Sequence, residues 1–200
     1  MSLRFRSALI VTISTALLLA GIYFLANNIV LREHNHLEET RATINSERVV
    51  EALKSRLDAI DVMARDWSAW DDMYNYTITK DEEFREGNLM PPQLLNTSRD
   101  VLIVLGKEKE VLCALKLSNE LSQVVTIKPS TLETLEESGV FDHNHKDSVH
   151  KGIIEIEEGI LLFASRPIIP SSTKGEIRGT LIFGNFLNDK FISSLGTSTR

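Results

Sequence analysis

The residues best suited to chemistry lie in one short string of aromatic and acidic side chains, Asp66-Trp67-Ser68-Ala69-Trp70-Asp71-Asp72-Met73-Tyr74. A helix through this string turns by about 100° per residue, which brings Trp67, Trp70 and Tyr74 onto one face. The same geometry places Asp71 in the middle of that face. Rings and a carboxylate together can bind an amine through cation–π contacts and a charge pair. The alternative is that the rings fill the core, with Asp71 capping a backbone amide or pairing with an arginine.

A second charged residue, Arg166, stands alone in the apolar segment Leu161-Leu162-Phe163-Ala164-Ser165-Arg166-Pro167. An inward carboxylate at Asp71 needs a cation, because burial of an unpaired charge is costly. Three arrangements are therefore open. Arg166 pairs with Asp71, or a ligand such as an amino acid bridges the two, or Arg166 is exposed at a strand edge, where Pro167 is tolerated. The predicted ligand-binding residues are Trp67, Trp70, Asp71, Tyr74 and Arg166.

Catalytic and metal-binding chemistry is not predicted. The sequence contains no nucleophile elbow, phosphate loop, zinc-helix motif or dinucleotide fingerprint. His143, His145 and His150 share a polar loop, but their spacing matches no standard metal-ligand motif. Asp71 and Asp72 face different directions on a helix, which argues against an acid/base pair. We therefore expect no enzyme activity, no metal and no cofactor in this chain, and a buried role for its single cysteine, Cys113.

A long helix is predicted over residues 32–76, which contain no glycine or proline. Its apolar residues are spaced by alternating steps of three and four, at Val50, Leu53, Leu57, Ile60, Ala64 and Trp67. Such a seam favours either a stalk that dimerises near a membrane or a helix that packs on its own domain. We expect the first half to be a stalk, through which the chain forms a homodimer, and the second half to be a core helix.

Short apolar runs separated by turn residues predict a sheet over residues 100–187. Strands are expected at 101–105, 111–115, 152–157, 160–169 and 177–186. Ser130 and Glu133 have the spacing of a capping box, which predicts a short helix that Gly139 ends. A further helix is expected to begin between 188 and 195. Successive strands of this kind form an antiparallel meander, so the predicted fold class is α+β, with the long helix packed on the sheet.

An apolar run near the N-terminus predicts a transmembrane helix over residues 7–31. Residues 8–26 carry no charge, which is long enough to cross a bilayer. The run continues to Leu31, beyond what a cleaved signal peptide needs. Arg4 and Arg6 precede it, so residues 1–6 are expected in the cytoplasm and residues 32–197 outside it as one domain, in the cell membrane. A second span is expected after the end of the chain.

Composition supports one folded domain and limits its partners. The chain has 200 residues, of which 42% are hydrophobic and 25% charged, as in globular proteins. The net charge of −6 argues against a nucleic-acid partner, because neutralising phosphates requires an excess of lysine and arginine.

The string Asp66–Tyr74 resembles the Asp-Trp-x-x-Trp-Asp-Asp-x-Tyr signature of the fourth CHASE family of extracellular sensor domains, found in prokaryotic receptors. Ser165-Arg166-Pro167-Ile168-Ile169 and the segment from Gly179 to Leu187 also resemble this family, so that the likeness covers roughly residues 32–197. Relatives often have arginine after the closing glycine, where this chain has Asn185. The resemblance implies a PAS-like or Cache-like sheet behind a long N-terminal helix, attached to a histidine kinase, a diguanylate cyclase or a similar output module.

The function expected from these features is that of an extracytoplasmic sensor domain in a membrane-bound receptor. It would detect a small molecule and transmit through the long helix to an output module beyond residue 200. The alternative is a membrane-anchored interaction domain that binds another protein and takes no small-molecule ligand.

Overall fold

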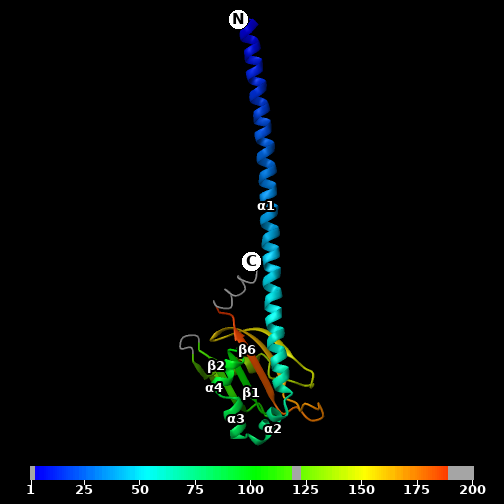
Figure 1. The fold of residues 1–200 in the computed structure, drawn as a ribbon, viewed down its shortest axis with the longest axis vertical. Coiled ribbons are helices and arrows are strands. Elements are labelled where there is room, and N and C mark those ends of the chain that lie inside the picture. Colours follow the sequence, from blue (N-terminus) through cyan, green and yellow to red (C-terminus); the bar gives the residue numbers. More distant parts are fainter. Residues whose placement is uncertain (1–2, 119–122, 189–200) are drawn as a thin grey trace. The chain divides into compact units, whose positions relative to one another are not determined.

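The computed structural model describes residues 3–118 and 123–188, and only the backbone of residues 3–6, 8, 10 and 26–43 (Figure 1). Two compact units divide the chain, Met1–Val50 and Glu51–Arg200. The helix that was predicted to begin between 188 and 195 lies outside the described residues, apart from its first position.

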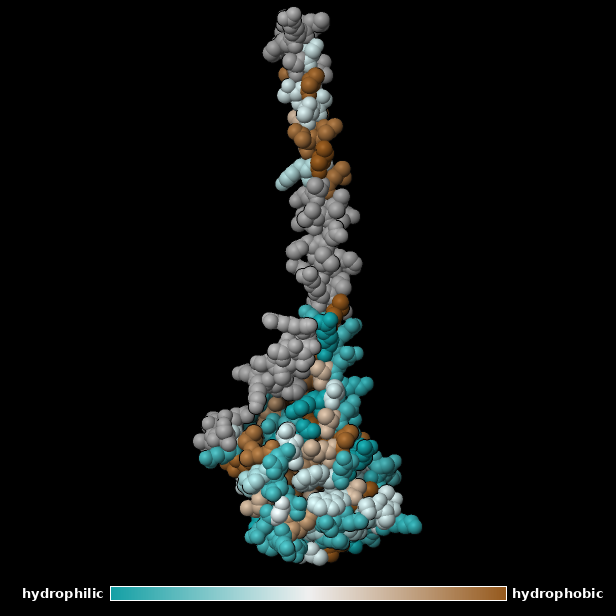
Figure 2. Space-filling model, in the orientation of Figure 1, coloured by the Kyte–Doolittle hydropathy of each residue, from teal (hydrophilic) through white to brown (hydrophobic). Residues whose placement is uncertain are grey.

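The first unit is helical from residue 3 onward and forms the N-terminal part of α1 (Leu3–Ser68). Large apolar side chains between residues 9 and 25 are exposed, for example Leu17 and Phe24 at 68% each; Figure 2 shows such residues in brown along this helix. Among the described residues, none of the helices combines the length and hydropathy that crossing a membrane requires. The transmembrane helix over residues 7–31 stays a prediction.

Helix α1 ends at Ser68, and a second helix, α2 (Asp71–Thr79), begins three residues later. Trp70 lies between them in an extended conformation, with φ −89° and ψ 128°. The helix predicted over residues 32–76 is therefore interrupted. No proline or glycine marks the interruption, but Asp71 and Asp72 occupy the first turn of α2, where acidic side chains interact favourably with the helix dipole.

Two short helices follow α2 and lead into the sheet. Helix α3 (Glu82–Asn88) is capped by Asp81, whose carboxylate accepts a hydrogen bond of 2.7 Å from the amide of Phe84. Helix α4 (Pro91–Asn96) begins with prolines, which are tolerated in the first turn of a helix. Both helices precede the first strand.

Six antiparallel strands form one sheet in the order β3-β2-β1-β6-β5-β4. The strands are β1 (Val101–Leu105), β2 (Val111–Leu117), β3 (Val124–Thr126), β4 (His150–Ile156), β5 (Gly159–Pro167) and β6 (Thr180–Phe186). Each half of the sheet is a meander, and the pairing of β1 with β6 joins the halves. The meander β4-β5-β6 and the β1–β2 hairpin were predicted, whereas β3 was not. The predicted α+β class with an antiparallel sheet is confirmed.

Helix α5 (Pro129–Glu137) connects the two halves of the sheet. Its N-cap is Lys128, so the capping box predicted at Ser130 is wrong. The Ser130 hydroxyl instead donates to Glu157 over 2.9 Å. Gly139 follows the helix with φ +74°, a conformation that glycine adopts without strain, which confirms the predicted end.

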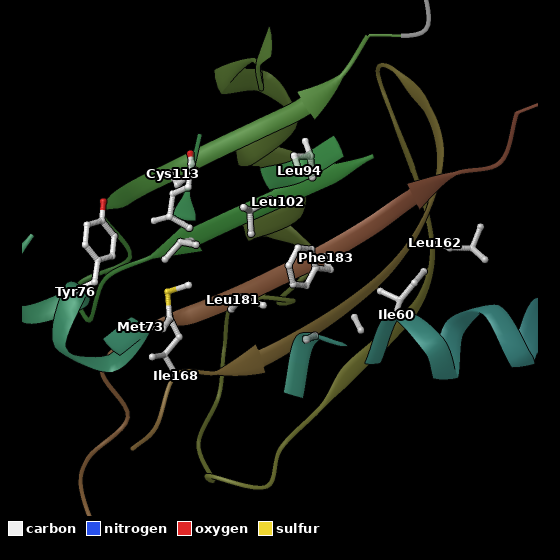
Figure 3. Packing of buried hydrophobic residues seen from close by; sticks show 14 residues of the cluster. Ile60, Met73, Tyr76, Leu94, Leu102, Cys113, Leu162, Ile168, Leu181 and Phe183 are labelled. Carbon is white, nitrogen blue, oxygen red and sulfur yellow. The ribbon is translucent and has the colours of Figure 1, made fainter. Parts of the chain in front are cut away.

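The sheet separates two apolar cores. Leu102 of β1 and Ile60 of α1 belong to one core (Figure 3). Val104 of β1 and Ala64 of α1 belong to the same core, and all four residues are fully buried. The alternate residues of β1 face the other core, which includes Leu135 of α5. A strand buried on both faces explains the continuous apolar run of β1. The second half of the predicted long helix is therefore a core helix, as expected.

Candidate functional site

Trp67 and Trp70 are half-buried and pack against the core between α1 and the sheet. The Trp67 ring meets Phe183 of β6 edge-on, with centroids 5.3 Å apart, and lies 6.2 Å from the Trp70 ring. Trp70 in turn contacts Phe84, again at 5.3 Å. These are favourable aromatic geometries, worth about 0.5–1.5 kcal/mol per pair beyond burial. The two tryptophans thus belong to the helix–sheet core, as the alternative interpretation of the string proposed.

Tyr74 is half-buried against the same core, whereas Tyr76, which the sequence analysis did not consider, is almost fully buried. Tyr76 stacks on Phe84 with centroids 5.1 Å apart, and its hydroxyl donates to the Leu112 carbonyl over 3.5 Å. Its position three residues after the buried Met73 was the available signal, since both lie on one face of α2.

Asp71 is exposed and caps the backbone of the loop after β5. Its two carboxylate oxygens accept hydrogen bonds from the Ser171 amide, at 2.8 Å, and the Ser171 hydroxyl, at 2.6 Å. These bonds, the hydroxyl first, lower the pKa of Asp71 below its usual value. The predicted inward position of Asp71 is wrong, because the interruption before α2 ends the helical geometry on which it depended. The capping alternative is confirmed.

Because Asp71 acts as an exposed cap, we expect the Asp71→Ala variant to fold. Its melting temperature should fall by no more than a few degrees, with unchanged circular dichroism. Asp72→Ala is the matched control, since Asp72 is the exposed neighbour in the same turn. Loss of the folded state in Asp71→Ala alone would contradict the assignment of Asp71 as a surface cap.

Arg166 pairs with Asp61 of α1, not with Asp71. Its Nε lies 2.7 Å from Asp61 Oδ1, and both side chains are largely buried, at 16% and 13% exposure. Lys151 of β4 adds a second cation, with Nζ 3.1 Å from Asp61 Oδ2 and 2.8 Å from Asp58. Arg166 lies in β5 beyond the last residue that pairs with β4 and pairs only with Leu181 of β6. Its side chain is largely buried, so the predicted exposed position is wrong.

Two opposing effects act on the pKa of Asp61. Burial alone raises the pKa of this carboxyl, but the hydrogen bonds and charges of Arg166 and Lys151 outweigh burial and lower the pKa below its usual value. Asp61 is therefore an anion held between two cations. Asp61 was not predicted as a site residue, because an acidic residue on a helix resembles part of a solvated face.

Arg99 forms a second polar contact between α1 and the sheet. This side chain is 7% exposed; its Nη2 donates to the Ala59 carbonyl and its Nη1 to Asn185 Oδ1, each over 3.1 Å. Burial, and then the nearby charge of Arg56, lower the pKa of Arg99. Asn185 thus orients the guanidinium of Arg99.

A third contact fixes the end of α1, where the Ile169 amide donates to the Ser68 carbonyl over 2.9 Å. We call these three sets of contacts the helix clamp. It comprises Ala59, Asp61 and Ser68 of α1, held by Arg99, by Arg166 with Lys151, and by Ile169. Apolar packing tolerates sliding, whereas these polar contacts fix the position of α1 against the sheet. The clamp is the candidate functional site.

The space between the opposite face of the sheet and α5 is closely packed and leaves no room for a water molecule. Leu161 and Phe186 line it, and a Lys116–Glu158 ion pair, with side-chain exposures of 14% and 11%, borders it. Thr131 of α5 donates to the same glutamate over 2.6 Å. Ligand pockets typically measure about 300–1,000 Å³, so this closely packed space is no pocket for an organic ligand.

Within the part of the chain that the structure describes, no group of three or more metal-ligating side chains is found. The rings of His143 and His150 lie next to each other, with centroids 4.8 Å apart and planes tilted by 37°. Cys113 is buried, as expected, and burial raises its pKa to about 12, which makes its thiol a poor nucleophile at neutral pH.

Known proteins resemble this chain in sequence and in fold. The chain is 25% identical over 136 residues to the "Methanogenesis regulatory histidine kinase FilI" of Methanothrix harundinacea (strain 6Ac); the match covers 68% of this chain and 15% of that protein. Among solved structures, the periplasmic domain of Vibrio cholerae LuxQ is similar at a TM-score of 0.51 and 16% identity, over 78% of this chain and 70% of that one.

A second solved structure, the extracellular domain of vpHK1S-Z8, gives a TM-score of 0.52 at 15% identity, over 74% of this chain and 57% of that one. At such identities the likeness concerns the fold. The profile of the CHASE4 domain matches residues 52–200, from the clamp-bearing part of α1 through the whole sheet. The chain therefore belongs to the CHASE4 family of extracellular sensor domains.

Proposed function

We propose that this chain is the extracytoplasmic sensor domain of a membrane-bound signalling receptor, and that α1 transmits its state to a cytoplasmic output module. The helix clamp is the observation that carries this proposal. Asp61, Ala59 and Ser68 are fixed to strands and loops of the sheet. A rearrangement of the sheet would therefore displace α1.

Membrane anchorage is the second part of the proposal. Residues 7–31 are proposed to cross the cell membrane, with residues 1–6 in the cytoplasm and residues 32–200 outside it. Support comes from the exposed apolar side chains between residues 9 and 25, since exposed apolar surface of this kind favours an apolar environment. A second span beyond the chain would lead to the output module.

The output and the assembly are proposed by analogy. FilI is named a histidine kinase, and this chain resembles 15% of its length, so a histidine kinase is the proposed output. The chain itself is proposed to have no enzyme activity. A homodimer through the membrane-proximal half of the long helix would let two clamps act on one output module.

Two inputs are candidates. A small molecule would bind at the surface formed by Asp71, Tyr74 and the loop that contains Ser171. Arg166 would not take part, because it is already paired with Asp61. The second candidate is a protein partner. It is favoured by the packing of Trp67 and Trp70, which fill the space that a ligand box between them would need.

A thermal-shift screen of the full chain in detergent separates the two inputs. Amino acids, amines, carboxylates and divalent metals are added to the unsubstituted chain, Asp71→Ala and Asp72→Ala. A ligand at a hundredfold excess over its Kd stabilises the folded state by about 2.7 kcal/mol. A shift that Asp71→Ala alone abolishes supports a small molecule at Asp71. If no compound shifts any of the three proteins, the small-molecule input is rejected in favour of a protein partner.

A further inference from the structure

The segment between α5 and β4, residues 138–149, is attached to the sheet by side chains. Three successive backbone carbonyls, those of residues 140, 141 and 142, each accept a hydrogen bond from a different strand. The donors are Ser165 Oγ of β5, Thr180 Oγ1 of β6 and His150 Nε2 of β4, at 2.6, 3.2 and 2.7 Å. Val140 and Phe141 are buried, so this attachment covers part of the second core.

His143 stands at the centre of this attachment, between two serine hydroxyls. Its Nε2 lies 3.0 Å from Ser165 Oγ, and its Nδ1 lies 2.7 Å from Ser148 Oγ. The Ser165 hydrogen is directed to the Val140 carbonyl, so the Ser165 oxygen can only accept from the ring. The hydrogen of a neutral His143 is therefore assigned to Nε2, and Nδ1 must accept.

Ser148 has one hydroxyl hydrogen and two acceptors for it. One acceptor is Nδ1 of His143, and the other is the His145 carbonyl, 2.6 Å from Ser148 Oγ. With a neutral ring, the hydrogen points to Nδ1. When Nδ1 takes a proton from solvent, the new N–H donates to Ser148, whose hydrogen turns to the His145 carbonyl. The carbonyl also accepts from the Ser148 amide, so it has a partner in both states.

Charges around His143 oppose its protonation. The His150 ring lies against it at a tilt of 37°, and Arg166 of β5 contributes a further positive charge. Asp142 favours protonation but is itself bound to Lys109 at 2.8 Å. Burial first, and then His150 and Arg166, lower the pKa of His143 to about 4. A proton on Nδ1 of His143 thus has a hydrogen-bond partner, but it adds a positive charge beside His150 and Arg166.

We propose that His143 is a proton-operated switch for the 138–149 segment. Protonation of its Nδ1 places a cation against His150 and Arg166 and weakens the attachment of this segment to β5. The switch is a property of the folded domain and does not depend on the proposed receptor function.

Hydrogen exchange of the 138–149 segment between pH 7 and pH 4 tests the switch. In the attached state the pKa of His143 is lowered, whereas in the opened segment it returns to about 6.5. Opening is therefore favoured as the pH falls from about 6.5 to about 4 and changes little below that. After correction for intrinsic rates, exchange should accelerate roughly a hundredfold in the unsubstituted chain.

The His143→Gln variant can keep both hydrogen bonds of the neutral ring and cannot take the proton, so its exchange should lack this acceleration. His145→Gln, two residues along the same segment, is the matched control and should accelerate like the unsubstituted chain. Equal acceleration in both variants, or none in the unsubstituted chain, would overturn the switch.

Nitrogen-detected NMR of the histidine rings provides a test that needs no substitution of His143. At pH 7 the spectrum should show the Nε2–H form, with titration near pH 4, and His150→Gln should raise that pKa. An Nδ1–H form, or a titration unaffected by His150→Gln, would contradict the assigned hydrogens and charges.

Discussion

Replacing Asp61 with asparagine is expected to lower the free energy of unfolding by about 2–4 kcal/mol, measured by urea denaturation at pH 7. The reason is that Arg166 would remain largely buried without its anion, and Lys151 would lose one of two carboxylates. Removing one partner of a fully buried pair costs about 3–5 kcal/mol, and the partial exposure of this pair reduces the effect.

Asp58→Asn is the matched control for this substitution, because Asp58 contacts the same Lys151 from a half-exposed position. It should change stability by less than about 1 kcal/mol. The double variant Asp61→Leu with Arg166→Met should recover part of the loss, since it leaves no unpaired charge behind. Equal small effects of Asp61→Asn and Asp58→Asn would show that the buried pair does not hold α1 to the sheet.

Lowering the pH should weaken the contact of Asp61 with Arg166 and Lys151. The pKa of Asp61 is lowered in the folded state, so its contribution to stability is present above the usual value of 3.8 and is lost as the pH falls through the folded-state pKa. The effect of His143 lies mainly between pH 6.5 and 4. The two effects therefore occupy different pH ranges and can be separated by the variants described above.

The second large effect is expected for Trp67→Ala, which should destabilise the domain by about 3–5 kcal/mol. The substitution removes the ring that packs edge-on against Phe183, a fully buried residue of β6, and leaves a cavity between α1 and the sheet. Urea denaturation, with the cooperativity of unfolding compared between variants, measures this loss.

Trp67→Phe should retain much of the contact with Phe183 and therefore cost less than Trp67→Ala. Val62→Ala, at a 49% exposed position of the same helix, should alter stability by no more than about 0.5 kcal/mol. If Trp67→Ala left stability unchanged, the ring could not be part of the core, and its use as one wall of a ligand box would become the better interpretation.

The sheet was predictable from sequence because its strands are short apolar runs between turn residues. The run at residues 101–105, buried on both faces, and the meander over residues 150–186 lie where the pattern indicated. The start of α5 was misplaced, because Ser130 at capping-box spacing was a false signal; its hydroxyl bonds to Glu157 across the fold.

The site was less predictable, because its geometry depends on one interruption in a helix. Residues 69–70 contain no helix breaker, so a helical projection placed Asp71 inward, whereas Asp71 begins a new helix at the surface. The need of Arg166 for a carboxylate was foreseen, but the partner was Asp61, a full turn and more before the signature string. Long-range pairing of this kind leaves no local pattern in a sequence.

Arg99 shows the same limit. It precedes β1 in a polar stretch typical of a turn, yet it is buried and donates to the Ala59 carbonyl near the C-terminal end of α1. Only the packing of α1 across the start of β1 and the end of β6 brings Ala59, Arg99 and Asn185 together. The acceptors of the Arg99 guanidinium could therefore not be predicted from the sequence alone.

The most direct test of transmission through α1 is the autophosphorylation rate of a chimera in which residues 1–200 replace the corresponding sensor region of FilI. The helix clamp predicts that Asp61→Asn changes this rate at least about fivefold, whereas Asp58→Asn leaves it unchanged. Circular dichroism of the chain alone establishes that both variants are folded. If two folded variants gave the rate of the unsubstituted chimera, signalling would not depend on the attachment of α1 to the sheet through Asp61, and the proposed route would be wrong.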